Sequence, residues 1–541
     1  MLADEVAAQG GKINSVKMTP RTFSESEYCH LKRVSCIKFH PTKPYLVAMS
    51  MIEYLKFNER AAITGKSFDS NVLIMNFSDN HIITLSHVLE TPIEISSIEF
   101  HPENPNVIIG GCLNGQVICW DITSTDHRIT AGNKKTDNMG GGDGEDFTTG
   151  GIEEDDKQQS IIKMRHLSQS SIMSSHKNFV GDLAFVPANI NVDKRNPSEG
   201  KFTHFLSVSE DGIVNIWDTR PVDKDALQKQ PDYMWKPFLR LDLFKQDGSG
   251  ELGLARCLVD RTATTPTFWA ASDEGDLCLI DWSVKPVGGG DDGPKFAEYV
   301  KFTYESEKEY RPALALERSP FYPNLLLTVH NFHFAIWKID LPNYDQPIFA
   351  SAPTTNTAHN TCGAFSPTRP GVIFITKTDG IDVWDFLDGS NKPSLTLNFA
   401  TSVITYMKFQ YYKHADQKQY MAFGDEKDGT LFLWEVPSNL KNPLPNEKEN
   451  IEIIWDREVK KCLFVIEQRE AKKEEYTIAK AEKEKNAALA EQAREISQEA
   501  LDQKELEQEE KYQELLLAYK EKNNMISEEE LEAIKAKKKK K

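Results

Sequence analysis

A glycine turn followed by a short alternating apolar strand and a closing apolar residue recurs along most of this 541-residue chain. The first clear copy is GGCLNGQVICWDI at residues 110–122, where the strand ends in Trp120 and Asp121. An Asp at the end of a strand could be a catalytic group, but recurrence assigns it to a repeated scaffold. Later copies are EDGIVNIWD (210–218), DEGDLCLID (273–281), HNFHFAIWK (330–338), TDGIDVWD (378–385) and KDGTLFLWE (427–435). A weaker copy upstream, SNVLIMNFSD (70–79), makes a seventh.

Each copy has an earlier partner strand, which often runs into Phe and Pro, as in CIKFHP (36–41) and SIEFHP (97–102). Successive closing positions lie 47 to 97 residues apart. A four-stranded propeller blade takes roughly 40 to 50 residues, so the longer intervals need insertions. Residues 131–160 are rich in Gly and Asp and too poor in apolar side chains to build a core. The sequence therefore predicts an all-β fold, a seven-bladed WD-repeat β-propeller, with a disordered insertion at about residues 126–170.

The characteristic residues of such repeats have structural roles. The closing Trp packs between blades, while a turn Asp, a middle-strand Ser and a His form a buried hydrogen-bonded set. The fullest set in this chain is His176, Ser207, Asp211 and Trp217. Other blades carry Asn114 or Glu274 at the turn and no obvious His, so we expect them to depend more on apolar packing. The remaining residues assigned to the blades are Trp120, Asp121, Trp337, Trp384, Asp385 and Trp434.

Composition excludes several classes of protein. The net charge of −18 argues against a nucleic-acid binder, and no apolar run approaches the ~20 residues of a membrane span. The eight Cys are scattered without a CxxC pair, which predicts reduced thiols in a cytoplasmic protein, without a zinc site. Gly65-Lys66-Ser67 resembles the end of a phosphate loop, but Arg60 stands where that motif needs its first Gly. We predict no catalytic residue, no metal site and no cofactor.

The composition changes after about residue 445. The following segment is rich in Glu, Lys, Ala, Gln and Leu, and residues 451–523 lack Pro and Gly, which favours a long charged α-helix. A sustained heptad seam is missing, so we expect the first turns to dock on the propeller and a cluster near the end to meet a partner. That cluster includes Leu515, Leu516 and Tyr519. The predicted organisation is a tail at 1–27 that could supply a ring-closing strand, the propeller at 28–445 and a helical extension at 446–541.

Residues 28–440 resemble the WD-repeat region of dynein intermediate chains. The resemblance rests on VSCIKFHPTKPYLVAMS, on EDGIVNIWDTRP and most specifically on PNVIIGGCLNGQVICWD. The chain is most similar to the intermediate chain of the two-headed axonemal inner arm, and the charged C-terminal helix suits that type.

The resemblance implies a non-catalytic subunit in the axoneme of cilia and flagella. It implies that the propeller holds dynein heavy-chain tails together beside a second intermediate chain, while light chains bind segments N-terminal to the propeller. Only about 27 residues precede the first predicted blade strand, so light-chain binding is left undecided.

Two other functions are kept as alternatives. One is a WD-repeat adaptor in ciliary transport or dynein preassembly. The other is an enzyme built on the propeller, which no convergent ionisable site supports. For partner contact, we single out the long loop Glu53–Ser70 of the first blade, which holds Tyr54, Leu55 and Phe57 among charges. An ordinary long hairpin would explain that loop equally well.

Overall fold

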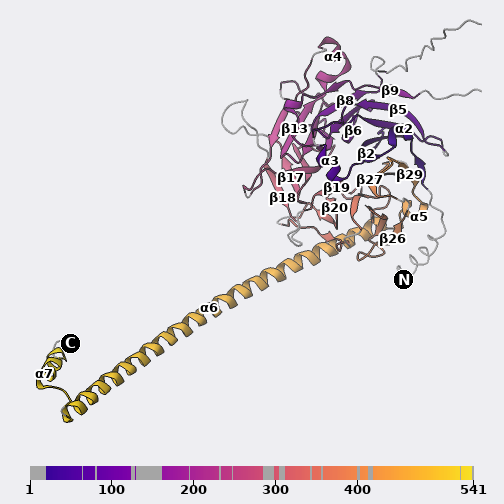
Figure 1. Cartoon of the computed structure of the whole chain (residues 1–541). Coiled ribbons are helices and arrows are strands. Elements are labelled where there is room, and N and C mark those ends of the chain that lie inside the picture. Colours follow the sequence, from indigo (N-terminus) through magenta and orange to yellow (C-terminus); the bar gives the residue numbers. More distant parts are fainter. Residues whose placement is uncertain are drawn as a thin grey trace, which may run out of the picture. The chain divides into compact units, whose positions relative to one another are not determined.

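Seven sheets, each with four antiparallel strands, form a closed ring of blades in the computed structural model (Figure 1). The structure describes residues 20–63, 65–79, 82–123, 128, 161–193, 195–230, 233–246, 248–283, 298–303, 311–341, 344–354, 358–398, 402–411, 418–523 and 525–538. The prediction of a seven-bladed propeller followed by a long helix is confirmed. The chain divides into two compact units. The first is Met1–Glu458, which contains the propeller, and the second is Val459–Lys541, which contains most of the long helix.

In the first six blades, four strands follow one another in chain order from the centre of the ring outwards, whereas the seventh blade takes its outermost strand, β1, from the N-terminal end. The first four blades are β2–β5 (Lys32–Phe39, Leu46–Glu53, Ser70–Asn76, Thr84–Thr91), β6–β8 with β10 (Ile95–Phe100, Val107–Cys112, Val117–Asp121, Ser168–Gln169), β11–β14 (Val180–Phe185, His204–Ser209, Ile213–Asp218, Leu239–Asp242) and β15–β18 (Leu254–Leu258, Thr267–Ser272, Leu277–Asp281, Glu298–Phe302). The last three are β19–β22 (Ala313–Arg318, Leu325–His330, Phe334–Lys338, Phe349–Ala350), β23–β26 (Asn360–Phe365, Val372–Lys377, Gly380–Asp385, Leu395–Leu397) and β27–β29 (Ile404–Phe409, Tyr420–Asp425, Leu431–Glu435) with β1 (Arg21–Phe23).

The ring closes through its two ends. Strand β1 pairs antiparallel with β29, with Thr22 opposite Phe432, so the N-terminal strand completes the seventh blade. The sequence predicts the tail at 1–27 as a possible source of this strand, and β1 lies within it. Residues 12–19 lie outside the described residues, and the described chain after β29 continues into α5 (Ser438–Lys441) and α6 (Glu447–Lys522). Pairing between the two ends of a propeller removes exposed sheet edges.

The predicted insertion at 126–170 is wrong at its C-terminal end. Residues 129–160 lie outside the described residues, but β9 (Ile162–Met164) pairs in parallel with β5 as a fifth strand of the first blade. Strand β10 then supplies the outer strand of the second blade by pairing with β8. The chain after the insertion therefore completes two neighbouring blades. Strands of two and three residues are too short to show periodicity in a sequence.

Every innermost strand carries a bulge at the same place, one residue after the strand's first or third position. The register shifts in all seven of these strands. The hydroxyl of the bulged residue reaches the next blade at three junctions. Ser35 donates to the Ile95 carbonyl at 2.7 Å, Ser96 to the Val180 carbonyl at 2.6 Å, and Thr405 to the Val34 carbonyl at 2.7 Å. The bulges thus turn unpaired strand positions into bonds between blades.

The remaining described helices are short or lie in the second unit. They are α2 (Ser26–Cys29), α3 (Phe57–Ala62), the 3₁₀ turns Ile172–Ser174 and Arg220–Val222, α4 (Lys224–Lys229) and α7 (Glu528–Lys538). The core lies between the blades, and the closing Trp side chains of the second, third, fifth and seventh blades are almost fully buried within it.

Candidate interaction face

The third blade brings together the four residues that the sequence assigned to one polar set. Trp217 donates its indole N–H to Ser207 Oγ at 2.8 Å, and Ser207 Oγ lies 2.7 Å from His176 Nε2. His176 Nδ1 lies 3.2 Å from Asp211 Oδ1. When the Ser207 hydroxyl donates to Nε2, Nδ1–H donates to Asp211, so each group of the set has a partner. Burial alone would raise the pKa of Asp211, but the bond from His176 and two backbone N–H groups lower it below its ordinary value. The arrangement holds the blade together.

The fifth blade contains a second version of this set, which sequence reasoning missed. Trp337 donates to Thr328 Oγ1 at 2.9 Å, and His330 Nε2 lies 3.1 Å from the same oxygen. The Arg311 carbonyl, 3.3 Å from His330 Nδ1, stands in for the turn Asp. His330 belongs to the middle strand itself, whereas His176 precedes its blade. The sequence does contain a signal for this second set, because Thr328 stands two residues before a His and nine residues before the closing Trp.

The Asp residues that directly follow the closing Trp residues accept hydrogen bonds within turns. Asp121 accepts the Thr123 N–H at 2.9 Å, and Asp385 accepts the Leu387 N–H at 3.0 Å. This is the geometry of an Asx turn, in which a short carboxylate bonds the backbone two residues on. The neighbouring Trp120, Trp384 and Trp434 side chains are buried. The arrangement supports a fold role for these acids.

One face of the propeller is formed by the turns that join the first to the second strand and the third to the fourth strand of each blade. Because the strands of a blade alternate in direction, these turns gather at the same end of the ring. We call this surface the first-turn face. The long loop Glu53–Ser70 joins a second to a third strand and lies at the opposite end.

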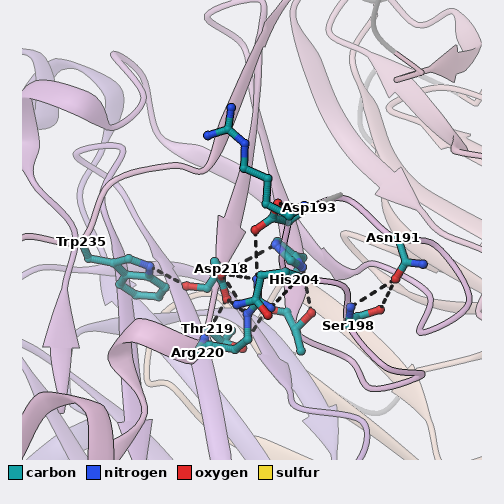
Figure 2. Close-up of polar contacts among 11 residues, drawn as sticks. Asn191, Asp193, Ser198, His204, Asp218, Thr219, Arg220 and Trp235 are labelled. Carbon is teal, nitrogen blue, oxygen red and sulfur yellow. Dashed lines mark hydrogen bonds and ion pairs between the residues drawn. The ribbon is translucent and has the colours of Figure 1, made fainter. Parts of the chain in front are cut away.

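The first-turn face carries an anchored excursion between β11 and β12, residues 187–203 (Figure 2). Arg220 donates to the Asp218 carboxylate from Nε and from Nη2, with Nη2 to Oδ2 at 2.7 Å. Its Nη1 donates to the Asn196 carbonyl at 2.8 Å. Within the excursion, Asn191 Oδ1 accepts from the Ser198 hydroxyl at 3.0 Å. The planar guanidinium therefore ties the third strand's end to the excursion.

The same face receives the start of α6, residues 447–458. Arg369, in the first turn of the sixth blade, bonds both oxygens of Glu447 at 3.2 and 3.1 Å and Asp385 Oδ2 at 2.8 Å. Ile451 is fully buried against Gly371, and Trp455 packs edge-on against Phe386 with ring centroids 4.9 Å apart. Burial raises the pKa of Asp385, and Arg369 opposes that rise. These contacts fix the first turns of the helix to the sixth blade, and Tyr322 of the fifth blade donates its hydroxyl to the Lys448 carbonyl at 2.6 Å.

A cavity of about 660 Å³ opens at the centre of the first-turn face. Ion pairs cross it between blades: Lys38 with Glu99, and Lys408 with Glu317. Burial would lower the pKa of Lys38, but the Glu99 carboxylate raises it above its ordinary value. Deeper in, Arg256 donates to the carbonyls of Leu314 at 2.8 Å and Gly181 at 2.7 Å, which links three blades.

The residues singled out for partner contact fall into two places. In the first blade, Phe57 on α3 is 85% exposed, whereas Tyr54 and Leu55 are half-buried. Arg60 of the same helix is paired with the buried Glu94 at 3.1 Å, which fixes α3 on the blade. On α6, Leu515 and Tyr519 are 71% and 63% exposed and Leu516 is half-buried.

No three or more His, Cys, Asp or Glu residues within the described ranges gather as metal ligands do. In those ranges, no helix is both long and apolar enough to cross a membrane.

Fold and face together define a WD-repeat propeller whose ring is closed by its N-terminal strand and whose first-turn face holds a charged helix. A sequence model described as the dynein axonemal intermediate chain 3 WD40 domain matches residues 19–263 and 252–436. The chain belongs to this family of dynein intermediate chains.

Individual relatives agree with this assignment. The chain is similar to dynein axonemal intermediate chain 3 of Homo sapiens, at 26% identity over 537 residues, 86% of this chain and 58% of the relative. It is 25% identical to the protein of that name from Danio rerio over 476 residues, 76% of this chain and 47% of the relative. Similarity extends to dynein axonemal intermediate chain 2 of Homo sapiens, at 24% over 429 residues, 79% of this chain and 56% of the relative. The chain spans about half to three fifths of the length of these relatives.

Proposed function

We propose that this chain is a non-catalytic intermediate chain of axonemal dynein and that it holds heavy-chain tails together in the inner arm. The observation that carries the proposal is the family match over nearly the whole propeller, residues 19–436. The relatives' names place them in the axoneme, so we expect this chain there as well.

The geometry favours a scaffold over an enzyme. The polar sets of the third and fifth blades consist of bonds that satisfy one another, and the strand-end acids are engaged in turns. A rigid ring with surface loops is suited to presenting several contact surfaces at fixed spacing. We propose the heavy-chain tails and a second intermediate chain as partners, and we leave light chains to experiment.

The apolar stripe near the end of α6 is the surface that we assign to one of these partners. Tyr512, Leu515, Leu516 and Tyr519 share one side of the helix by their spacing of three and four residues. Tyr512, Leu515 and Tyr519 are each more than 60% exposed. A clustered apolar stripe on an exposed helix is typical of a protein contact.

The test is cross-linking mass spectrometry on dynein extracted from axonemes, with this chain tagged. Cross-links from the propeller to heavy-chain tails are the expected result. Recovery of the chain in the soluble cell-body pool, with chaperone-like partners and without heavy chains, would refute the proposal in favour of an adaptor in transport or preassembly.

A matched pair of variants tests the stripe. Leu515→Glu places a charge within it, whereas Gln513→Glu adds the same charge about 160° away from Leu515 around the helix. We expect Leu515→Glu to reduce recovery of one arm component by at least tenfold and Gln513→Glu to leave recovery unchanged. Equal recovery with the two variants would remove the stripe from the proposal.

A further inference from the structure

Two turns of nearly the same sequence lie on the first-turn face, and they differ in one hydrogen bond of their His side chains. FHPTKP (39–44) follows the innermost strand of the first blade, and FHPENP (100–105) follows that of the second. In each copy the His Nδ1 accepts two backbone N–H groups. The distances are 3.2 and 3.0 Å from Thr42 and Lys43 to His40, and 3.2 and 3.0 Å from Glu103 and Asn104 to His101. Since Nδ1 accepts in both, a neutral ring carries its proton on Nε2.

The two Nε2–H groups have different surroundings. His101 donates to the Phe202 carbonyl of the anchored excursion at 2.8 Å. His40 Nε2 is buried and finds no acceptor among the residues that the structure describes, and only 6% of His40 is exposed. Burial, together with the charge of Lys43, lowers the pKa of His40 to about 4, so the ring is neutral at physiological pH. A buried donor without an acceptor is costly, and such groups usually have a partner.

His40 lines the central cavity, where a second donor is also unused. Arg318, at the end of the innermost strand of the fifth blade, binds Asp260 through Nη1, but its buried Nε has no partner in the described part of the chain. His40 and Arg318 therefore both line the same cavity, and they come from blades on different sides of it.

The charge of the cavity is opposite to that of the chain. Five Lys and Arg side chains line it against three acids, whereas the whole chain has a net charge of −18. The lining cations are Lys38, Arg256, Arg261, Arg318 and Lys408, and the acids are Glu99, Asp182 and Glu317. Arg261 is the most open of the paired cations, at 63% side-chain exposure and 3.9 Å from Glu99. A concave site with excess positive charge concentrates anionic ligands.

From these observations we propose that the cavity binds an acidic peptide segment of a partner protein, and that His40 and Arg318 turn their unpartnered Nε2 and Nε donors toward its carboxylates. An extended chain fits better than a small anion, because the two donors come from different blades and the cavity has the volume of a ligand site. This site is separate from the stripe on α6 and does not depend on which complex the chain joins.

The experiment measures binding of fluorescein-labelled hexaglutamate to the full chain by fluorescence anisotropy, with hexaglutamine as the neutral control. We expect saturable binding of hexaglutamate that weakens as salt rises. In His40→Asn the amide Oδ1 takes the place of Nδ1 and keeps the turn bonded, while the Nε2 donor is lost. This variant should weaken binding at least fivefold, as expected for loss of a hydrogen bond to a charged group.

The sister turn supplies the matched control. His101→Asn makes the same change where Nε2 already binds Phe202, so it should lower the melting temperature and leave peptide affinity within twofold. Arg261→Glu, on a largely exposed side chain, should weaken binding without unfolding the blade. Three results would each overturn the proposal: no saturable binding up to 1 mM hexaglutamate, equal binding of hexaglutamine, or wild-type affinity in a folded His40→Asn chain.

Discussion

The contact between Arg369 and Glu447 gives the sharpest prediction on how α6 is held to the propeller. Both side chains are nearly fully buried, with 5% and 1% exposure, and the guanidinium also bonds Asp385 and the Asn439 carbonyl. In Arg369→Leu two carboxylates lose their counter-charge in a site with little water. Removing one partner of a buried ion pair costs about 3–5 kcal/mol. We expect a loss of this size in the free energy that holds the helix start in place.

Hydrogen exchange measures this loss locally. Amides of residues 447–458 should lose protection in Arg369→Leu, while the middle strands β12 and β20 keep theirs, because a docked segment can open without unfolding the core. The control is Asp456→Ala, which breaks an exposed pair with Lys338 at 3.4 Å. An exposed pair contributes roughly 0–1 kcal/mol, so exchange should change little.

A double variant separates charge from packing. Replacing both Arg369 and Glu447 with Leu removes the uncompensated charge along with the pair, and such replacements are often neutral. The double variant should therefore recover part of the protection that Arg369→Leu loses, although Glu447 also accepts the Leu444 N–H at 2.7 Å. The reasoning is refuted if Arg369→Leu and Asp456→Ala change exchange equally.

Three further predictions concern the blades. The folded-state pKa of Asp211 is below its ordinary value, so its stabilisation is present above about pH 3.8 and is lost as the pH falls through the folded value. Acid titration of Asp211→Asn should accordingly show a flatter loss of stability. Gly115→Ala should lower the melting temperature more than Gly65→Ala: the two have φ of +87° and +88°, but only at Gly115 would a Cβ meet a carbonyl, that of His176 at 2.1 Å. Thr328→Val should lower the free energy of unfolding in urea by about 1–3 kcal/mol, because the Trp337 indole N–H and His330 Nε2 both lose their partner. Thr328→Ser keeps the hydroxyl and should cost less.

The repeated parts of the fold could be predicted from the sequence because each blade repeats a local pattern. Alternation, a glycine turn and a closing Trp lie within about ten residues, and the set around Ser207 and Trp217 follows the same spacing. The long helix was predictable for the same reason, since its composition is uniform over many turns.

The rest depends on contacts between distant segments, which leave no local period. Strand β1 has three residues and exists because β29 offers an edge more than 400 residues later. Arg369 and Glu447 are 78 residues apart, and neither stands out among the many charged residues of the chain. The donor at His40 Nε2 is visible only by comparison with His101, since the two turns read almost alike.

The two ends of the ring differ in how much room they leave for a partner. At the end opposite the first-turn face, tight turns press against the segments that lead into the next blade. A Cβ on Gly115 would lie 2.1 Å from the His176 carbonyl, and one on Gly275 would lie 2.4 Å from the Arg311 carbonyl. Such junctions are closed by backbone and cannot open without moving two blades. The first-turn face instead carries the excursion at 187–203, the start of α6 and the charged cavity. Side-chain contacts hold the excursion and the helix start in place, and charged side chains line the cavity. Side-chain contacts can be remade around a ligand at lower cost, so partner binding to the ring is expected at the first-turn face, with exposed Phe57 on α3 as the point to test at the other end.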